Sequence, residues 1–235
     1  MTEQTYRIAP VNERSGAGGD AAGGKCGRCA YRTLCLPLGL SERELAQVEG
    51  AIGYRRRLLR GDTVFRAGQP FSNLFAVRLG HVMTCRSDHR GERYVTGFPM
   101  AGDMLGMDAI GNGEHASTAI ALEDSEVCEI SYVRLQRLMV ELPRMMEHFH
   151  RMMSREISQD QSAIRFLGIL RADERLANLV LNLSARYATR GFSPRRFHLR
   201  MSRDDMARHL GLTLETVSRV LARFREQKLI RLDRR

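Results

Sequence analysis

The chain of 235 residues lacks the features that mark several common classes of protein. It has no uninterrupted apolar run near the roughly 20 residues that a membrane-spanning helix requires, so we expect no membrane partner. Its first ten residues contain no basic segment followed by an apolar one, which predicts a cytoplasmic, reducing location for the five cysteines. No Ser-His-Asp order, glycine-rich phosphate loop or paired-carboxylate site is present, and the seven histidines are scattered, so the sequence does not indicate an enzyme.

Positive charge is present in excess and is unevenly distributed. The formal net charge is +10, and the segment 190–235 alone holds 13 Arg and Lys against 5 Asp and Glu, a net charge of +8. A concentrated basic segment is typical of a nucleic-acid-binding domain, although a solvated surface has the same composition. Charge therefore suggests a polyanionic partner, but sequence motifs are needed to distinguish a nucleic-acid-binding domain from a solvated surface.

The residue pattern divides the chain into four expected parts. Residues 1–25 are rich in Gly and Ala towards their end and predict a flexible arm. Residues 26–141 are expected to form a β domain, because short β-rich segments separated by glycine-containing turns between residues 61 and 129 predict an antiparallel barrel or roll. A long helix is expected over 142–170, and a basic helical domain over 171–235.

The long helix is expected to begin near Pro143 and to end near Ile169, and its apolar residues have the spacing of a coiled-coil seam. Packing of the same stripe on the β domain would give the same spacing. One seam position is acidic, and in a parallel homodimer it would face its own copy. Two carboxylates at about 4 Å repel by ~1 kcal/mol in water and ~4 kcal/mol at an intermediate effective dielectric, so we expect a marginal dimer that can be switched. The seam comprises Leu142, Met146, Met153, Ile157, Asp160, Ile164 and Leu167.

The segment 202–224 has the pattern of a helix-turn-helix. Ser202 and Asp205 can cap the first helix, Ala207 is small where two helices cross, Gly211 allows the turn, and Thr213 can cap the second helix. An αα-hairpin without a ligand would share this pattern, but the net charge of +8 around it favours DNA. The second helix is expected to bury Leu214, Val217, Val220 and Leu221.

If the segment binds DNA, its second helix lies in the major groove with its early residues on base edges. Arg219 is then the natural bidentate partner of guanine, Glu215 can accept from a cytosine amine, and Ser218 can bond to several bases. Phosphate contacts, which set affinity and register without reading sequence, are expected from Arg208, Thr213, Arg223 and Arg225.

Three cysteines near the N-terminus, Cys26, Cys29 and Cys35, form a C-x2-C-x5-C pattern. Three thiolates within ten residues can wrap one soft metal centre, and a fourth ligand would complete it. Zinc sites usually pair two C-x2-C motifs, so the pattern favours an iron-sulfur centre while structural zinc and unliganded cysteines stay open. We select Cys128 as the fourth ligand, because Cys85 has the surroundings of a strand core residue.

Residues 102–118 are similar to the phosphate cassette of cyclic-nucleotide-binding β-rolls. Such a cassette has an arginine just before a Ser or Thr to neutralise the phosphate. Here His115, Ala116, Ser117 and Thr118 provide no fixed positive charge. We therefore expect that no cyclic nucleotide binds.

From Cys26 to Leu232 the chain resembles the FNR (fumarate and nitrate reduction) regulators of the CRP/FNR superfamily of bacterial transcription factors. The run ETVSR matches the E-x-x-S-R pattern of FNR-type recognition helices. The resemblance implies an α+β fold with a cyclic-nucleotide-binding-like antiparallel β-roll, a long dimerisation helix and a C-terminal winged helix-turn-helix. The stretches that match are LAQVEGAIGYRRRLLRGDTVFRAG, YVTGFPMAGDMLGMDAIG and ATRGFSPRRFHLRMSRDDMARHLGLTLETVSR.

The resemblance also implies a function. The ligands of an oxygen-labile [4Fe-4S] cluster would be Cys26, Cys29, Cys35 and Cys128. The base contacts, in a two-fold TTGAT-like operator of double-stranded DNA, would be Glu215, Ser218 and Arg219. Without oxygen the cluster would support a DNA-binding homodimer, and its loss in air would release monomers.

Three further expectations follow from the resemblance. Leu34 would limit the access of oxygen to the cluster, although simple loop packing explains it equally well. The loop 87–94 would contact RNA polymerase. Relatives also extend further past the winged domain, which leaves open whether the wing is incomplete or the sequence is that of a truncated product. The main alternative is a zinc- or thiol-redox-based DNA-binding regulator of the same fold, and an iron-sulfur electron-transfer protein is disfavoured by the helix-turn-helix.

Overall fold

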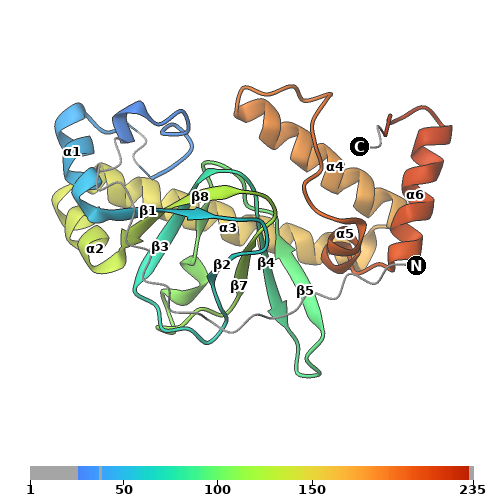
Figure 1. Cartoon of the computed structure of the whole chain (residues 1–235), viewed down its shortest axis with the longest axis horizontal. Coiled ribbons are helices and arrows are strands. Elements are labelled where there is room, and N and C mark those ends of the chain that lie inside the picture. Colours follow the sequence, from blue (N-terminus) through green and yellow to red (C-terminus); the bar gives the residue numbers. More distant parts are fainter. Residues whose placement is uncertain (1–25, 37–38, 233–235) are drawn as a thin grey trace.

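The computed structural model describes residues 26–36 and 39–232, which form a β-roll with helices at both ends (Figure 1). The expected flexible arm lies outside these residues. A short 3-10 turn, η1 (Cys26–Arg28), and helix α1 (Glu42–Ala51) precede the roll. α1 begins with a capping box in which Ser41 and Glu44 each bond the other's backbone N–H, which satisfies donors at the helix start. No described helix is long and apolar enough to cross a membrane.

The roll consists of two four-stranded sheets, and every strand pairing among the described residues is antiparallel, as the sequence predicted. The strand orders are β1-β8-β3-β6 and β2-β7-β4-β5. The first sheet comprises β1 (Ile52–Leu58), β3 (Asn73–Leu79), β6 (Met104–Leu105) and β8 (Ser125–Ser131). The second comprises β2 (Thr63–Phe65), β4 (Val82–Ser87), β5 (Arg93–Gly97) and β7 (Thr118–Ala121).

The space between the two sheets is filled by apolar side chains. Phe65, Phe75, Val82 and Val127 are buried at its centre. Cys85 of β4 is also buried, which agrees with its interpretation as a strand core residue. A second short 3-10 turn, η2 (Met107–Ala109), follows β6.

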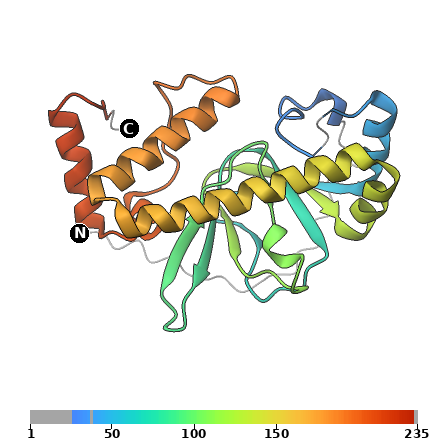
Figure 2. The ribbon, with the colours of Figure 1, turned by 180° about the vertical axis from the view of Figure 1, so that it is seen from behind.

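Two helices follow the roll, α2 (Tyr132–Glu141) and the long α3 (Pro143–Ile169). α3 begins and ends where the sequence predicted, and it crosses the whole back of the roll towards the C-terminal helices (Figure 2). The inclusion of Leu142 in the seam was wrong, because Leu142 ends α2 and is buried against the roll together with Met145 and Phe149. The spacing alone could not separate residues that face the roll from residues that face away from it.

The C-terminal helices are α4 (Ala172–Thr189), α5 (Arg203–Leu210) and α6 (Leu214–Glu226). The predicted caps are present: Ser202 with Asp205 at α5, and Thr213 at α6. The prediction that Leu214 is buried was wrong, because it is 49% exposed at the first position of α6. Between residues 171 and 232 the structure has no β-strand, so the expected wing is not part of what it describes.

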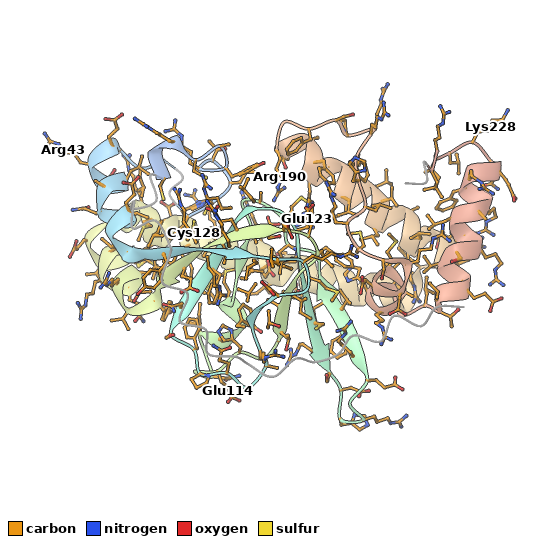
Figure 3. The ribbon with its side chains drawn as sticks, viewed as in Figure 1. Arg43, Glu114, Glu123, Cys128, Arg190 and Lys228 are labelled. Atoms are coloured by element: carbon orange, nitrogen blue, oxygen red, sulfur yellow. The ribbon has the colours of Figure 1, made fainter. Side chains whose placement is uncertain are left out.

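The C-terminal helices pack directly on the second sheet. Met83, Val95, Phe98 and Met100 of the roll belong to the same apolar cluster as the buried residues of α4, α5 and α6. Polar contacts reinforce this packing around Asp103, to which Nη2 of Arg190 donates at 2.6 Å and Nη2 of Arg186 at 2.5 Å. The view in Figure 3 shows Arg190 and Glu123 near the junction between the roll and the C-terminal helices.

Candidate metal centre and DNA-binding surface

The structure brings all four candidate metal ligands to one cavity. Cys26, Cys29, Cys35 and Cys128 line it, while the fifth cysteine, Cys85, is buried in the other sheet. The cavity lies between the N-terminal loop, α1 and the first sheet. Its other lining residues are Tyr31, Arg32, Leu36, Val48, Ile52, Arg55, Ala76, Val77, Arg78, Gly102 and Ile130.

Local backbone structure positions each cysteine. The 3-10 turn η1 bonds the N–H of Cys29 to the carbonyl of Cys26 at 3.0 Å, which places these two thiols on one turn. A second turn bonds the N–H of Cys35 to the carbonyl of Tyr31, also at 3.0 Å. Cys128 comes from the middle of β8, far along the chain, in the first sheet (Figure 3). Sequence spacing predicted the first three ligands together, and the roll supplies the fourth.

Cys26, Cys35 and Cys128 lie in a setting that opposes the ionisation of their thiols. Burial, reinforced by the neighbouring Cys128 thiol, raises the pKa of Cys26 to about 12. Burial also raises the pKa of Cys35 to about 12, and it raises the pKa of Cys128. A soft metal binds thiolates rather than thiols, so binding at this cavity would displace protons.

The four thiols offer the donor set of a soft metal centre. Within the described ranges, no group of three His, Cys, Asp or Glu side chains is placed to hold a single metal ion. Zinc bonds each sulfur at about 2.3 Å and therefore needs its thiolates close together. Four thiols around one largely apolar cavity also provide the donor set of an iron-sulfur cluster. The residues present therefore fit the cluster.

The cysteine loop rests on the long helix α3. Nε2 of His148, a buried residue of α3, lies 3.2 Å from the carbonyl oxygen of Cys35. Cys35, Cys128 and Phe149 belong to one apolar cluster that also contains α1 and α2 residues. The candidate metal centre and the candidate dimer helix thus share one packed core.

The outward face of α3 carries the predicted seam only in part. Met146 is 40% exposed and Ile157 is 55% exposed, so both are available for a partner helix. Met153 is half-buried and packs against the core around the cysteines. The other seam positions are in α3, but their side chains lie outside the described residues; they are Asp160, Ile164 and Leu167.

The helix-turn-helix has the geometry that its sequence predicted. Ala207, Val217 and Val220 are buried where α5 and α6 cross, and Gly211 takes the left-handed conformation with φ of 62°. Glu215 and Arg219 are exposed near the start of α6. Ser218 is half-buried, and Nη1 of Arg203 lies 3.4 Å from its hydroxyl oxygen.

The candidate phosphate contacts are spread around the same helices. Arg208 of α5 donates to Asp204 at 2.8 Å and to the carbonyl of Arg93 at 3.2 Å, while Arg225 is exposed on α6. Arg223 pairs with Asp173 of α4 at 3.0 Å. Thr213 is exposed, and its hydroxyl already accepts the N–H of Thr216 as a cap. Their proposed contacts with phosphate stay predictions.

Two further candidates take definite places. Leu34 is half-buried beside Gly102, where a Cβ would lie 3.0 Å from the Cβ of Leu34. Leu34 is not among the residues that line the cavity, and its role as an oxygen shield stays a prediction. The segment 87–94 comprises the turn between β4 and β5 and the strand residues that flank it, and its residues 87–92 are exposed.

Sequence reasoning missed the three arginines of the cavity wall. Arg32, Arg55 and Arg78 line the cavity from the loop, β1 and β3. Strand β1 was not among the predicted strands, and without its pairing to β8 nothing places Arg55 beside a cysteine. The cluster of Asp103, Arg186 and Arg190, which joins the roll to α4, was also not predicted from the sequence.

Comparisons with known proteins agree with this architecture. Residues 55–141 match the cyclic nucleotide-binding domain family, and residues 174–235 match the Crp-like helix-turn-helix domain family. The chain is 43% identical over 205 residues to the fumarate and nitrate reduction regulatory proteins of Escherichia coli and Shigella dysenteriae. These alignments cover 87% of this chain and 82% of each relative.

Solved structures show the same fold. FixK2 from Bradyrhizobium japonicum has a TM-score of 0.71 at 24% identity, over 77% of this chain and 88% of that chain. The c-di-GMP responsive global regulator CLP of Xanthomonas campestris has a TM-score of 0.67 at 24% identity, over 83% of this chain and 96% of that chain.

A β-roll, a long helix and a helix-turn-helix in this order define a DNA-binding transcription regulator, not an enzyme. The 43% sequence identity to the fumarate and nitrate reduction regulatory proteins, over most of the chain, identifies the family of regulators. The chain belongs to the FNR-like regulators of the CRP/FNR family.

Proposed function

We propose that this chain is an oxygen-responsive, sequence-specific regulator in which Cys26, Cys29, Cys35 and Cys128 hold a [4Fe-4S] cluster. The observation that carries the proposal is that these four thiols, three from one loop and one from β8, line a single cavity. When bound, the cluster supplies a centre that oxygen can destroy. The relatives are named fumarate and nitrate reduction regulatory proteins, which agrees with a role in gene regulation.

The chain's own residues link this site to dimerisation. The loop that carries Cys35 contacts α3 through His148, and the same apolar core holds Met153 of the predicted seam. Ligation orders the loop against α3, and an empty loop loses that constraint. We propose that α3 forms a marginal homodimer seam whose pairing follows the state of the loop, with Asp160 providing the repulsion.

The DNA partner follows from the C-terminal helices. We propose that Glu215, Ser218 and Arg219 read a two-fold TTGAT-like operator, while Arg208, Thr213, Arg223 and Arg225 contact phosphates. Two recognition helices of a dimer lie about 34–36 Å apart on one face of the duplex, so a monomer loses half of the contacts.

We also propose that the loop 87–94 contacts RNA polymerase. The protein is proposed to act in the cytoplasm and to bind no cyclic nucleotide. The proposed domain boundaries are 26–141 for the sensory β-roll, 142–170 for the dimerisation helix and 171–235 for the DNA-binding domain.

Metal analysis of anaerobically purified protein tests the proposal. Iron and acid-labile sulfide are expected in the wild-type protein and are expected to be lost on replacement of any one of the four cavity cysteines by Ser. Cys85→Ser is the matched control and should retain both, because Cys85 lies in the other sheet. Stoichiometric zinc without sulfide would instead identify a zinc-based regulator of the same fold.

A further inference from the structure

Arg55 of β1 lies directly opposite Cys128 of β8. The two residues are paired in the antiparallel register, so their side chains project from the same face of the sheet. Both line the cavity that the four cysteines share. Arg55 therefore stands beside a candidate ligand because of strand pairing, not because of sequence proximity.

The Nε–H of Arg55 is a buried donor without a hydrogen-bond partner. Oε1 of Glu126 is 3.9 Å from this nitrogen, which is too long for a hydrogen bond. Buried donors are rarely left unpaired in folded proteins, and each one requires an explanation. A group inside the cavity would provide the missing acceptor.

The other two arginines of the cavity have acceptors in the chain. Nη1 of Arg78 donates to Oε1 of Glu126 at 2.7 Å, and Nη1 of Arg32 donates to the carbonyl oxygen of Gly27 at 3.3 Å. Of these three arginines, Arg55 alone has a buried nitrogen without a partner. Arg55 is also the leading influence that opposes the effect of burial on the pKa of Cys128.

We propose that Arg55 is a positioning residue for the cluster, donating its Nε–H into the cavity and offsetting the negative charge that four thiolates bring there. This inference rests on the proposed function, because it requires a cluster. Much of the remaining wall is apolar, including Leu36, Val48 and Ile130, and cannot offset charge. Net charge and hydrogen bonds to the sulfurs are among the factors that set the reduction potential of an iron-sulfur centre.

The midpoint potential of the bound cluster, measured by anaerobic spectroelectrochemistry, tests the role of Arg55. Arg55→Gln should lower the potential, because adding an electron is harder once a nearby positive charge is removed. Arg55→Lys keeps the charge but lacks the Nε donor, so its potential should lie between those of the wild type and Arg55→Gln. Arg57→Gln and Arg57→Lys are matched controls on the same strand, because Arg57 is exposed and does not line the cavity.

A merely structural role would give a different pattern. In the iron-free protein, Arg55→Gln should unfold at a denaturant midpoint close to that of Arg57→Gln, since it removes a donor that has no acceptor there. An Arg55→Gln potential equal to that of Arg57→Gln would overturn the proposal. If Arg55→Gln does not fold, the midpoint potential of Arg55→Lys provides the test. A potential equal to that of Arg57→Lys would then overturn the proposal. Wild-type protein without iron and sulfide would refute the proposed function instead.

Discussion

Nε2 of His148 lies 3.2 Å from the carbonyl oxygen of Cys35, although 113 residues separate them in the sequence. This contact joins the cysteine loop to α3, the helix that carries the predicted dimer seam. Both residues are part of a packed region in which Cys35 and Phe149 share one apolar cluster. A change in the loop therefore reaches the long helix through direct contact.

Replacing His148 by Ala should weaken the coupling between the cysteine loop and the dimer. The four thiols stay, so iron and sulfide contents should remain near wild type. The difference in mean mass between anaerobic and aerated samples should shrink, because the loop loses its hydrogen bond to α3. Light scattering after gel filtration measures this difference. His150→Ala is the control, since His150 is exposed on the same helix; an equal response in both variants would contradict the coupling.

Replacing Gly102 by Ala should disturb the cavity wall. Gly102 has φ of +96°, and an added Cβ would lie 3.0 Å from the Cβ of Leu34 and 3.5 Å from the Cβ of Tyr31. Backbone strain in this region costs about 1–2 kcal/mol, and the clash must also displace the cysteine loop. We expect a lower denaturant midpoint and a lower iron-to-protein ratio.

Gly91→Ala separates these two effects. Gly91 has φ of +79°, but nothing lies within 4 Å of its added Cβ. It should show the strain alone and keep its full iron content. If Gly102→Ala and Gly91→Ala take up iron equally, the contact between the loop and the 102–103 turn does not shape the site.

Stability should fall in mild acid through His81. The ring of His81 lies between Glu123, with Nδ1 2.5 Å from Oε1, and Tyr187, with Nε2 2.9 Å from the hydroxyl oxygen. Burial is the main cause that lowers the pKa of His81. Glu123 opposes this effect, whereas the charges of Arg200 and Arg186 add to it. The unfolded chain, with a histidine pKa of about 6.5, then binds protons first as the pH falls. The free energy of unfolding should therefore decrease below about pH 6.5. Burial lowers the pKa in the same direction for His115, His148 and His209.

Urea unfolding between about pH 7.5 and 5.5 measures this loss of stability. His81→Gln should reduce the pH dependence, whereas His89→Gln, on the exposed β4–β5 turn, should leave it unchanged. An undiminished pH dependence in His81→Gln would show that His81 does not contribute.

Base contacts and phosphate contacts should respond differently to substitution. Arg219→Ala should cost about 1–3 kcal/mol of binding free energy and relax preference at one base pair. Arg225→Ala should weaken binding to all sequences alike, and so should Arg223→Ala. Arg223 also pairs with Asp173, so its replacement should lower stability by up to about 1 kcal/mol. Fluorescence anisotropy with matched and single-mismatch operators measures these effects; equal loss of preference in all three variants would refute the sorting of contacts.

Local signals predicted much of the fold. The caps at Ser202 and Thr213, the turn at Gly211 and the start of α3 at Pro143 depend on neighbouring residues, and the structure agrees with each. The prediction that Leu214 is buried was wrong because the first residue of a helix can face solvent even when it is apolar. Helices α1, α2 and α4 and strand β1 were not predicted.

Long-range pairing limited the prediction of the site. The spacing of Cys26, Cys29 and Cys35 is a local signal, and Cys128 could be chosen because Cys85 looked like a core residue. The position of Arg55 opposite Cys128 depends on strand register, and the contact of His148 with Cys35 depends on how α3 crosses the roll. Neither can be obtained from spacing within one segment.

The most direct test of the account is the mass of one anaerobic sample, measured by light scattering with its visible absorbance before and after exposure to air. Under argon, we expect iron-sulfur absorbance and the mass of two chains. In air, we expect loss of that absorbance and a fall to the 26.7 kDa of a single chain. Colourless, iron-free protein under argon, or a mass that air does not change, would contradict it.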